Sequence, residues 1–208
     1  MMRLGLPKGR NLKTALAAFR AAGLQLEGLD EKARQLRRRF ESEDIEVLML
    51  KDWDLPLYIE HGIADFGVVG ADVLEEVDGD LLVPVRFNEG GCRLSLIGKS
   101  EELPAPGAQI RLATKYPNLA RRLVATRSWG AEIFKLSGSV ELGPLLELSE
   151  MALDIVQTGG TLRDNGLVEI EIVQQIQPCL VVNRASYQRH RRRLNELVSR
   201  LEEKELVF

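Results

Sequence analysis

The stretch that decides the fold reads Leu153-Asp154-Ile155-Val156-Gln157-Thr158-Gly159-Gly160-Thr161-Leu162. Its first four residues form a short apolar run with a single acid, and this pattern predicts a buried strand. The Thr-Gly-Gly-Thr sequence then predicts a loop, which a short helix follows. Strand, glycine loop and helix in this order are typical of an α/β protein.

This loop is suited to binding a phosphate monoester. Its glycines let backbone N–H groups converge on an anion, the helix start adds partial positive charge, and Thr158 and Thr161 add hydroxyl donors. Asp154, four residues before Thr158, could hold ribose hydroxyls beside the phosphate. The GxxxxGK[ST] spacing of a P-loop is absent. An ordinary tight turn with threonine caps is the alternative.

Outward from this stretch, apolar runs alternate with amphipathic segments along the chain. We expect strands at residues 3–6, 45–50, 65–69, 81–85, 93–97, 110–114, 132–136, 152–156, 168–176 and 179–182. We expect helices from Asn11, which could cap the first of them, to Gly23, and at 54–61 with Asp54 as cap, 119–126, 141–148 and 186–205. The pattern predicts an α/β fold with mixed, mostly parallel sheets.

The pattern also predicts two lobes, the second inserted into the first. The break at Gly90-Gly91 and the return near Gln177-Pro178 mark the ends of the insertion. Lobe I then comprises residues 1–91 plus 178–208, and lobe II comprises residues 92–177 and carries the glycine loop.

Composition excludes several classes of protein. The chain has 208 residues, 45% of them hydrophobic and 28% charged, with a net charge of −3. These proportions suit a soluble globular protein, and the charge argues against bulk nucleic-acid binding. No apolar run approaches the roughly 20 residues of a membrane span, and no signal peptide is evident, so we expect a cytoplasmic protein. Two cysteines and two histidines without metal-ligand spacing argue against a zinc site.

Further candidate residues follow other expected strands. Glu141, in the loop Ser137-Gly138-Ser139-Val140-Glu141, could bind ribose or a magnesium-bound water, or it could only favour the helix dipole. Lys8 and Arg10 place two cations at a strand-to-helix turn, which suits a diphosphate, although a solvated turn is the alternative. Asp54 and Asp72 occupy similar strand ends, where capping is an equal explanation.

Two basic runs remain. One contains Lys32, Arg34, Arg37, Arg38 and Arg39 and could contribute to an anion site, although such a run is usually a solvated face. The other, Arg189 to Arg193, opens the last helix. Its apolar stripe favours a packed helix with a basic outer face over a nucleic-acid site.

Taken together, these residues resemble the ATP phosphoribosyltransferase family. The segments that carry the resemblance are Leu6-Pro7-Lys8-Gly9-Arg10, Asp54-Leu55-Pro56, Gly62-Ile63-Ala64-Asp65-Phe66-Gly67, Gly91-Cys92-Arg93-Leu94, Ala113-Thr114-Lys115-Tyr116-Pro117, Gly138-Ser139-Val140-Glu141 and residues 154–162. The resemblance implies a two-lobed fold like that of periplasmic binding proteins, with the site in the cleft. It implies phosphoribosyl transfer from phosphoribosyl pyrophosphate to N1 of ATP, with Mg²⁺ and release of pyrophosphate, as the first step of histidine biosynthesis.

The resemblance also assigns residues to roles. Phosphoribosyl pyrophosphate would be bound by Asp154, Thr158, Gly159, Gly160, Thr161 and Glu141, and ATP by Asp54, Asp72, Cys92, Arg93, Thr114 and Tyr116. The catalytic cations would be Lys8, Arg10, Arg34 and Lys51, aimed at the leaving pyrophosphate. Because adenine N1 already carries a lone pair, no histidine base is required.

The chain ends before the regulatory domain of longer family members, so it resembles the short form. That form implies a partner resembling histidyl-tRNA synthetase, and a homodimer within a hetero-octamer. Four positions depart from the family pattern: Ala33 stands where serine is common, Lys51 where arginine is common, Glu147 where glycine is expected and Ala152 where isoleucine or valine is expected. Lys51 keeps the charge but loses the bidentate fork of arginine.

Two other functions remain open from the sequence. A purine or orotate phosphoribosyltransferase would share the phosphate loop, but such enzymes usually carry paired acids before it, and here Ile155 follows a single Asp154. A non-catalytic, two-lobed protein that binds a small molecule would share the fold.

Overall fold

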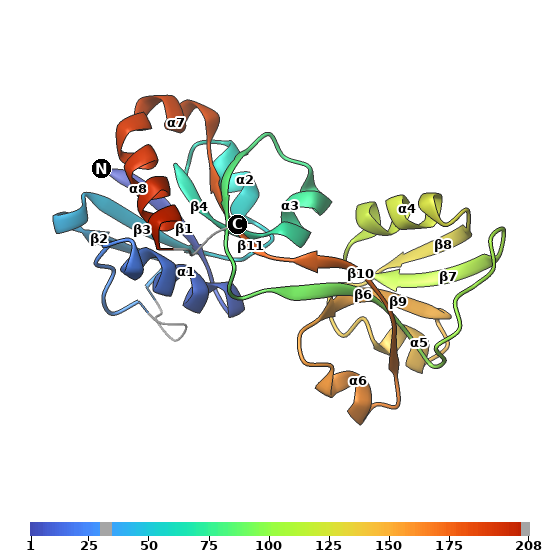
Figure 1. Ribbon diagram of the computed structural model, residues 1–208. Helices are drawn as coiled ribbons and strands as arrows, with labels where there is room; N and C mark the ends of the chain where they lie inside the picture. Colours follow the sequence, from blue (N-terminus) through green and yellow to red (C-terminus); the bar gives the residue numbers. More distant parts are fainter. Residues whose placement is uncertain (30–34, 205–208) are drawn as a thin grey trace. The chain divides into compact units, whose positions relative to one another are not determined.

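The computed structural model describes residues 1–29 and 35–204, and for Arg10 it describes the backbone alone. The chain divides into two compact units (Figure 1). Unit 1 comprises Met1–Gly91 and Gln177–Phe208, and unit 2 comprises Cys92–Ile176. The chain therefore passes from unit 1 into unit 2 and returns, and each unit has its own sheet.

The sheet of unit 1 has six strands in the order β2-β3-β1-β4-β11-β5. Their bounds are β1 Met2–Pro7, β2 Arg37–Phe40, β3 Ile45–Leu50, β4 Phe66–Gly70, β5 Leu82–Arg86 and β11 Pro178–Val182. Strand β1 pairs in parallel with β3 and with β4, whereas β2 and β11 run antiparallel to their neighbours. The carboxyl ends of β1, β3 and β4 consequently lie at one edge of the sheet.

Helices cover both faces of this sheet. They are α1 Arg10–Ala21, α2 Leu55–Glu60, α3 Ala71–Val77, α7 Arg184–Arg189 and α8 Arg191–Glu203. Apolar residues of α1 and α8 share one buried cluster with β1, β3, β4 and β11. On the opposite face α2 approaches so closely that a Cβ added to Gly67 would lie 2.9 Å from side-chain atoms of Leu55 and Ile59. Glycine at this position lets α2 pack directly on the strands.

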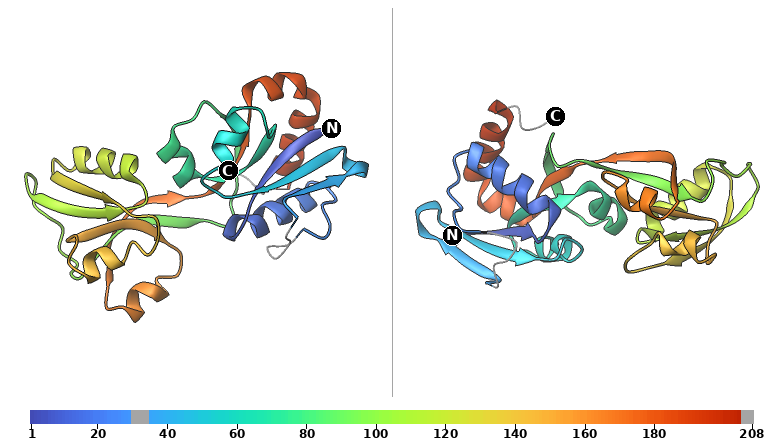
Figure 2. Two further views of the ribbon diagram at one scale, coloured as in Figure 1. Left: turned by 180° about the vertical axis from the view of Figure 1, so that it is seen from behind. Right: turned by 90° about the horizontal axis from the view of Figure 1, so that it is seen from below.

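Unit 2 contains a five-stranded sheet in the order β10-β6-β9-β7-β8. The strands are β6 Cys92–Gly98, β7 Gln109–Thr114, β8 Gly130–Lys135, β9 Met151–Val156 and β10 Val168–Ile176, and the helices are α4 Pro117–Thr126, α5 Leu142–Leu145 and α6 Gly160–Asp164. The views of Figures 1 and 2 agree that α4 covers one face of the sheet while α5 and α6 lie on the other. A buried cluster that includes Val140, Val156, Leu162 and Leu167 packs beneath α5 and α6.

The prediction of an α/β fold with mixed sheets is confirmed. The antiparallel pairs arise from three strands, β2, β6 and β11, and the remaining strands of each sheet run in a common direction. Within residues 1–29 and 35–204, no helix combines the length and the apolar character needed to cross a bilayer.

Helix ends differ from the predictions in two places. The first helix begins at Arg10 with Gly9 as its N-cap, so the prediction that Asn11 caps it is wrong, and Asn11 is instead buried inside the helix. Asp54 does occupy the N-cap of α2, but its side chain makes no capping hydrogen bond. Gly23 and Gly62 end α1 and α2 as expected, because both adopt positive φ and are followed by Schellman-type hydrogen bonds.

Two predicted helices are shorter than expected. The last segment is broken at His190 into α7 and α8 rather than forming one helix over 186–205. The helix expected over 141–148 is reduced to Leu142–Leu145, because Glu147 takes the left-handed conformation with φ of 62°. The Leu148 amide then donates to the Gly143 carbonyl at 3.0 Å, which closes a Schellman turn. Glycine is the residue best suited to this position, and the sequence carries glutamate.

Strand β2 was not predicted, because its residues were interpreted as a solvated basic run. The arginines of β2 instead form contacts within unit 1. Arg37 and Arg39 bind the buried Glu46 of β3, at 2.9 and 3.3 Å, and lower the pKa of that carboxyl. Arg38 donates to the Gly28 carbonyl at 2.7 Å and stacks on the Phe40 ring. Lys32 and Arg34 lie outside the described residues.

Candidate functional site

A pocket of about 300 Å³ in unit 2 brings together the residues predicted to bind phosphoribosyl pyrophosphate. It is lined by Ile97, Glu141, Leu162 and every residue from Asp154 to Thr161. Strand β9 supplies Asp154, the loop after it supplies the two threonines and two glycines, and Glu141 precedes α5. All six predicted residues thus border one cavity, although 13 or more positions separate Glu141 from the others in sequence.

The loop in this pocket has a conformation that requires glycine. Gly159 is left-handed, with φ of 71° and ψ of 10°, and it forms the N-cap of α6. A Cβ added there would lie 3.2 Å from Nη1 of Arg163, which donates to the Thr158 carbonyl at 3.2 Å. Arg163 therefore braces the loop from the following helix. The Thr158 hydroxyl in turn accepts a long, 3.5 Å hydrogen bond from the Gly160 amide.

The charge of the pocket comes from acids. Its described lining contains the carboxylates of Glu141 and Asp154 and no lysine or arginine. An anion in the loop would therefore be held by backbone N–H groups and threonine hydroxyls rather than by cations. Among residues 1–29 and 35–204, no three histidine, cysteine or acidic side chains gather as a metal site. A divalent ion would consequently need oxygens from a bound phosphate in addition to these two carboxylates.

The residues predicted to bind ATP are divided between the units. Asp54 and Asp72 belong to unit 1, and Cys92, Arg93, Thr114 and Tyr116 belong to unit 2. Thr114 is fully buried; its hydroxyl donates to the Leu153 carbonyl at 2.7 Å and accepts from the Tyr116 amide at 2.9 Å. In this structure Thr114 joins β7 to β9 and supports the turn before α4, so its hydroxyl is not available to a ligand.

Arg93 is likewise engaged by the protein. Its guanidinium binds Glu169 of β10 through Nε at 2.5 Å and through Nη2 at 2.7 Å, and its Nη1 donates to the Gln157 carbonyl at 3.0 Å. Ser95, which is fully buried, donates to the same carboxylate at 2.6 Å. Arg93 and Ser95 together lower the pKa of Glu169, and Glu169 raises the pKa of Arg93.

In unit 1, the backbones of two predicted catalytic residues, Lys8 and Lys51, lie next to each other. Lys8 and Lys51 directly follow β1 and β3, which pair in parallel up to Pro7 and Leu50. The Lys8 amide donates to the Leu50 carbonyl at 3.0 Å, and both lysine side chains are exposed. The adjacent strand β4 ends at Gly70, just before the buried Asp72. The side chain of Arg10 and the whole of Arg34 lie outside the description.

Sequence analysis missed Ser95, Arg163 and Glu169. Arg163 could have been found, because it follows the loop within one helical turn and is basic. Glu169 could not, because its proximity to Arg93 depends on the antiparallel pairing of β10 with β6, and that register is shifted at two points.

Comparisons with known proteins agree with this architecture. Residues 51–203 match the family model described as HisG, ATP phosphoribosyltransferase. The chain is 40% identical to an ATP phosphoribosyltransferase of Thermus thermophilus, over 97% of this chain and 96% of the relative. It is 42% identical to one of Deinococcus radiodurans, over 97% and 90%. In structure it resembles the ATP phosphoribosyl transferase (HisG:HisZ) complex from Thermotoga maritima, with a TM-score of 0.80, 33% identity and coverage of 98% and 97%.

More distant likenesses concern the fold alone. The substrate-binding protein of an amino acid ABC transporter aligns with a TM-score of 0.57 at 8% identity, covering 98% of this chain and 92% of that one. The fold is therefore that of the two-unit α/β proteins that include such binding proteins. Within that class, the chain belongs to the ATP phosphoribosyltransferase family. It is a glycosyltransferase whose reaction is the first step of histidine biosynthesis. Non-catalytic binding proteins, the alternative left open by the sequence, share this fold but do not belong to this family.

Proposed function

We propose that the chain transfers the phosphoribosyl group of phosphoribosyl pyrophosphate to N1 of the ATP adenine, and that the pocket of unit 2 holds the phosphoribosyl group. The observation that supports this proposal is the gathering of Asp154, Glu141 and the loop from Thr158 to Thr161 around one cavity. The loop N–H groups and hydroxyls bind the 5-phosphate, and the Asp154 carboxylate accepts hydrogen bonds from the ribose hydroxyls. The products are N1-(5-phosphoribosyl)-ATP and pyrophosphate.

The chemistry follows from the groups present. The N1 lone pair forms the new bond to C1 of the ribose, while the bond from C1 to pyrophosphate breaks and the leaving group takes its electron pair. Positive charge develops on the ribose and negative charge on the leaving group, so positioning and electrostatics supply the catalysis. Lys8 and Lys51 stabilise the leaving pyrophosphate, and we assign Arg10 and Arg34 to the same role.

We propose Mg²⁺ as the metal of this reaction. The two carboxylates of the pocket and the oxygens of a bound pyrophosphate suit this ion, which is usually held by one or two carboxylates plus substrate phosphates. Glu141 and Asp154 would hold it, and it would neutralise charge on the leaving group. A cytoplasmic location, where ATP is supplied, is part of the proposal.

We also propose a second subunit. The relative from Thermotoga maritima is described as a HisG:HisZ complex, and it aligns over nearly the whole of this chain. We infer that this chain assembles with a regulatory subunit that resembles histidyl-tRNA synthetase, as a homodimer within a hetero-octamer. Pyrophosphate release from ATP and phosphoribosyl pyrophosphate, measured with and without that subunit, tests the partner, and no release under either condition would refute the activity.

Thr161→Ala tests the loop. Loss of one hydroxyl bond to a phosphate is worth roughly 1.5–3 kcal/mol, so we expect the KM for phosphoribosyl pyrophosphate to rise about 10- to 150-fold. Thr126→Ala is the matched control, because the Thr126 hydroxyl bonds only to carbonyls of its own helix α4 among the contacts described. Equal KM values for the two variants, with both folded, would exclude the loop as the phosphate site.

A further inference from the structure

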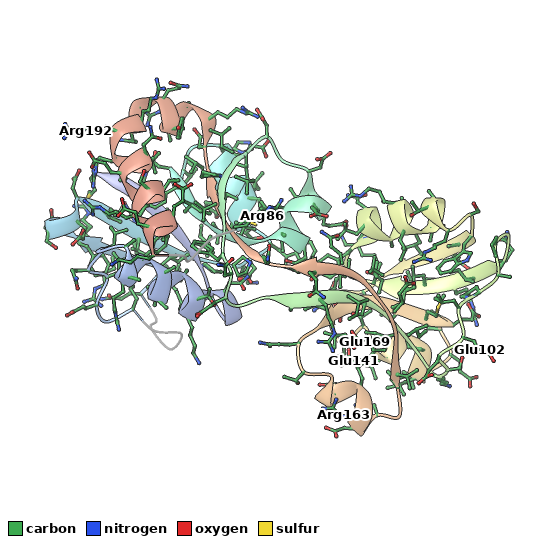
Figure 3. The ribbon with its side chains drawn as sticks, in the orientation of Figure 1. Arg86, Glu102, Glu141, Arg163, Glu169 and Arg192 are labelled. Atoms are coloured by element: carbon green, nitrogen blue, oxygen red, sulfur yellow. The ribbon has the colours of Figure 1, made fainter. Side chains whose placement is uncertain are left out.

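One ion pair connects two strands at the edge of the unit 2 sheet, β6 and β10, to the start of the phosphate loop. Arg93 lies near the start of β6 and Glu169 near the start of β10, and their side chains are 25% and 23% exposed. The two contacts of 2.5 and 2.7 Å make the pair bidentate, which fixes the plane of the guanidinium as well as its distance. Figure 3 labels Glu169, and Glu141 of the pocket is labelled in the same unit.

The third arm of the guanidinium reaches the loop. Nη1 of Arg93 donates to the carbonyl of Gln157, the residue between the end of β9 and Thr158. Gln157 lines the pocket, whereas Arg93 and Glu169 are absent from its described lining. The pair therefore contacts the backbone of the site rather than the cavity. Its opposite charges largely cancel, so it adds little net charge to the pocket.

The Glu169 carboxylate is held by donors of neighbouring side chains. Its carboxylate accepts from two nitrogens of Arg93 and from the buried Ser95 hydroxyl, and these donors lower its pKa. Three donors aimed at one carboxylate hold it in a single orientation. Its geometry thus suits holding Arg93 in place.

We infer that Glu169 is a positioning residue for the phosphate loop and acts through Arg93. Glu169 orients the guanidinium, the guanidinium fixes the Gln157 carbonyl, and the following N–H groups and hydroxyls are thereby ordered before the substrate binds. This inference rests on the proposed function, and it gives Arg93 a role different from the direct ATP contact expected from the sequence. Without Glu169, the loop would become ordered only when the substrate binds, and this ordering would reduce the binding free energy of the substrate.

The inference predicts a selective kinetic effect. Glu169→Ala should raise the KM for phosphoribosyl pyrophosphate about tenfold and leave the KM for ATP within twofold. Arg93→Lys should behave similarly, because an ammonium cannot hold the carboxylate in two places and also reach Gln157 in a fixed plane. Glu169→Gln keeps an acceptor for Ser95 and Arg93 and should recover part of the loss.

A neighbouring ion pair provides a matched control. Glu171 lies two residues further along β10 and pairs with Arg127, which follows α4, and neither residue lines the pocket. Glu171→Ala removes the same group from the same strand, so it should change both KM values by less than twofold. If Glu171→Ala raised the KM for phosphoribosyl pyrophosphate as much as Glu169→Ala does, the sheet as a whole would be disturbed, and the inference would be overturned.

A double-mutant cycle separates positioning from direct contact. If Glu169 acts through Arg93, the double variant Arg93→Ala/Glu169→Ala should be no worse than the worse single variant. A further tenfold rise in the KM for ATP, or a further tenfold fall in kcat, on adding Arg93→Ala to Glu169→Ala would show that Arg93 touches substrate, and would overturn the inference.

Thr161→Ala, measured alongside, distinguishes this failure from failure of the proposed function. A raised KM for Thr161→Ala with no effect of Glu169→Ala refutes the positioning role alone, and no effect of either refutes the phosphate loop. Circular dichroism and Tm establish that each variant is folded. Should Glu169→Ala fail to fold, Glu169→Gln and Arg93→Lys carry the same test, and unchanged KM values in both overturn the inference.

Discussion

Replacing Glu147 with glycine is expected to give a more stable protein than replacing it with alanine. Glu147 has φ of 62° at the end of α5, and its side chain is 82% exposed and pairs with Lys99 at 3.3 Å. The left-handed conformation costs a residue with a Cβ about 1–2 kcal/mol. Glycine avoids this cost but has more freedom in the unfolded chain, which takes back about 0.4–1 kcal/mol. An exposed ion pair adds at most about 1 kcal/mol and usually less.

The sharpest comparison is between Glu147→Gly and Glu147→Ala. Both variants lose the ion pair with Lys99, so their difference isolates the Cβ in the left-handed conformation. We expect glycine to exceed alanine by about 1 kcal/mol, or roughly 2–4 °C in Tm for a chain of this size. Thermal denaturation followed by circular dichroism measures this difference, and pyrophosphate release should be unchanged because Glu147 is outside the pocket lining. An alanine variant as stable as the glycine variant would refute the reasoning.

Three further predictions concern the loop, acid stability and the thiols. Gly159→Ala should lower the free energy of unfolding by about 1 kcal/mol and also raise the KM for phosphoribosyl pyrophosphate, because alanine strains the left-handed loop and displaces Arg163; an unchanged Tm and KM would contradict this. Because the pKa of Glu169 is lowered from its ordinary 4.5, its stabilising contribution is complete above about pH 4.5 and is lost as the pH falls through its lower folded pKa. The Tm advantage of the native chain over Glu169→Gln should therefore shrink in acid, and a constant difference from pH 7 to 3 would count against it. Burial raises the pKa of Cys179 to about 11 and Cys92 is also buried, so a thiol reagent at pH 8 should label both cysteines only on unfolding, as mass spectrometry would detect.

The alternation of strands and helices could be predicted because it depends on local patterns. The bounds of β3 at Ile45–Leu50 and of β10 at Val168–Ile176 match the predictions, since apolar runs with clear flanking breaks mark both. Strand β2 was missed because Arg37–Phe40 carries three arginines, and only pairing with β3 brings Glu46 close enough to neutralise two of them. Local propensity contains no such information.

The candidate site also has one part that local sequence patterns predict and another part that depends on the tertiary structure. The glycine loop and Asp154 are contiguous in sequence, so the strand-loop-helix pattern was enough to select them. The part played by Glu169 depends on how β10 pairs with β6, and the buried position of Thr114 depends on packing between strands. Both facts belong to the tertiary structure, and no spacing in the sequence indicates them.

The insertion of unit 2 has a consequence for the order in which the chain can fold during synthesis. Unit 2 begins and ends on neighbouring strands, with Cys92 opposite Ile176. Strand β11, which lies between β4 and β5, and helix α8, which completes the unit 1 core, are both translated after the whole of unit 2. The ribosome therefore delivers every strand of the unit 2 sheet before the unit 1 sheet can close. The unit that is begun first is the one completed last, and until then its β4 and β5 edges stay exposed to wrong partners.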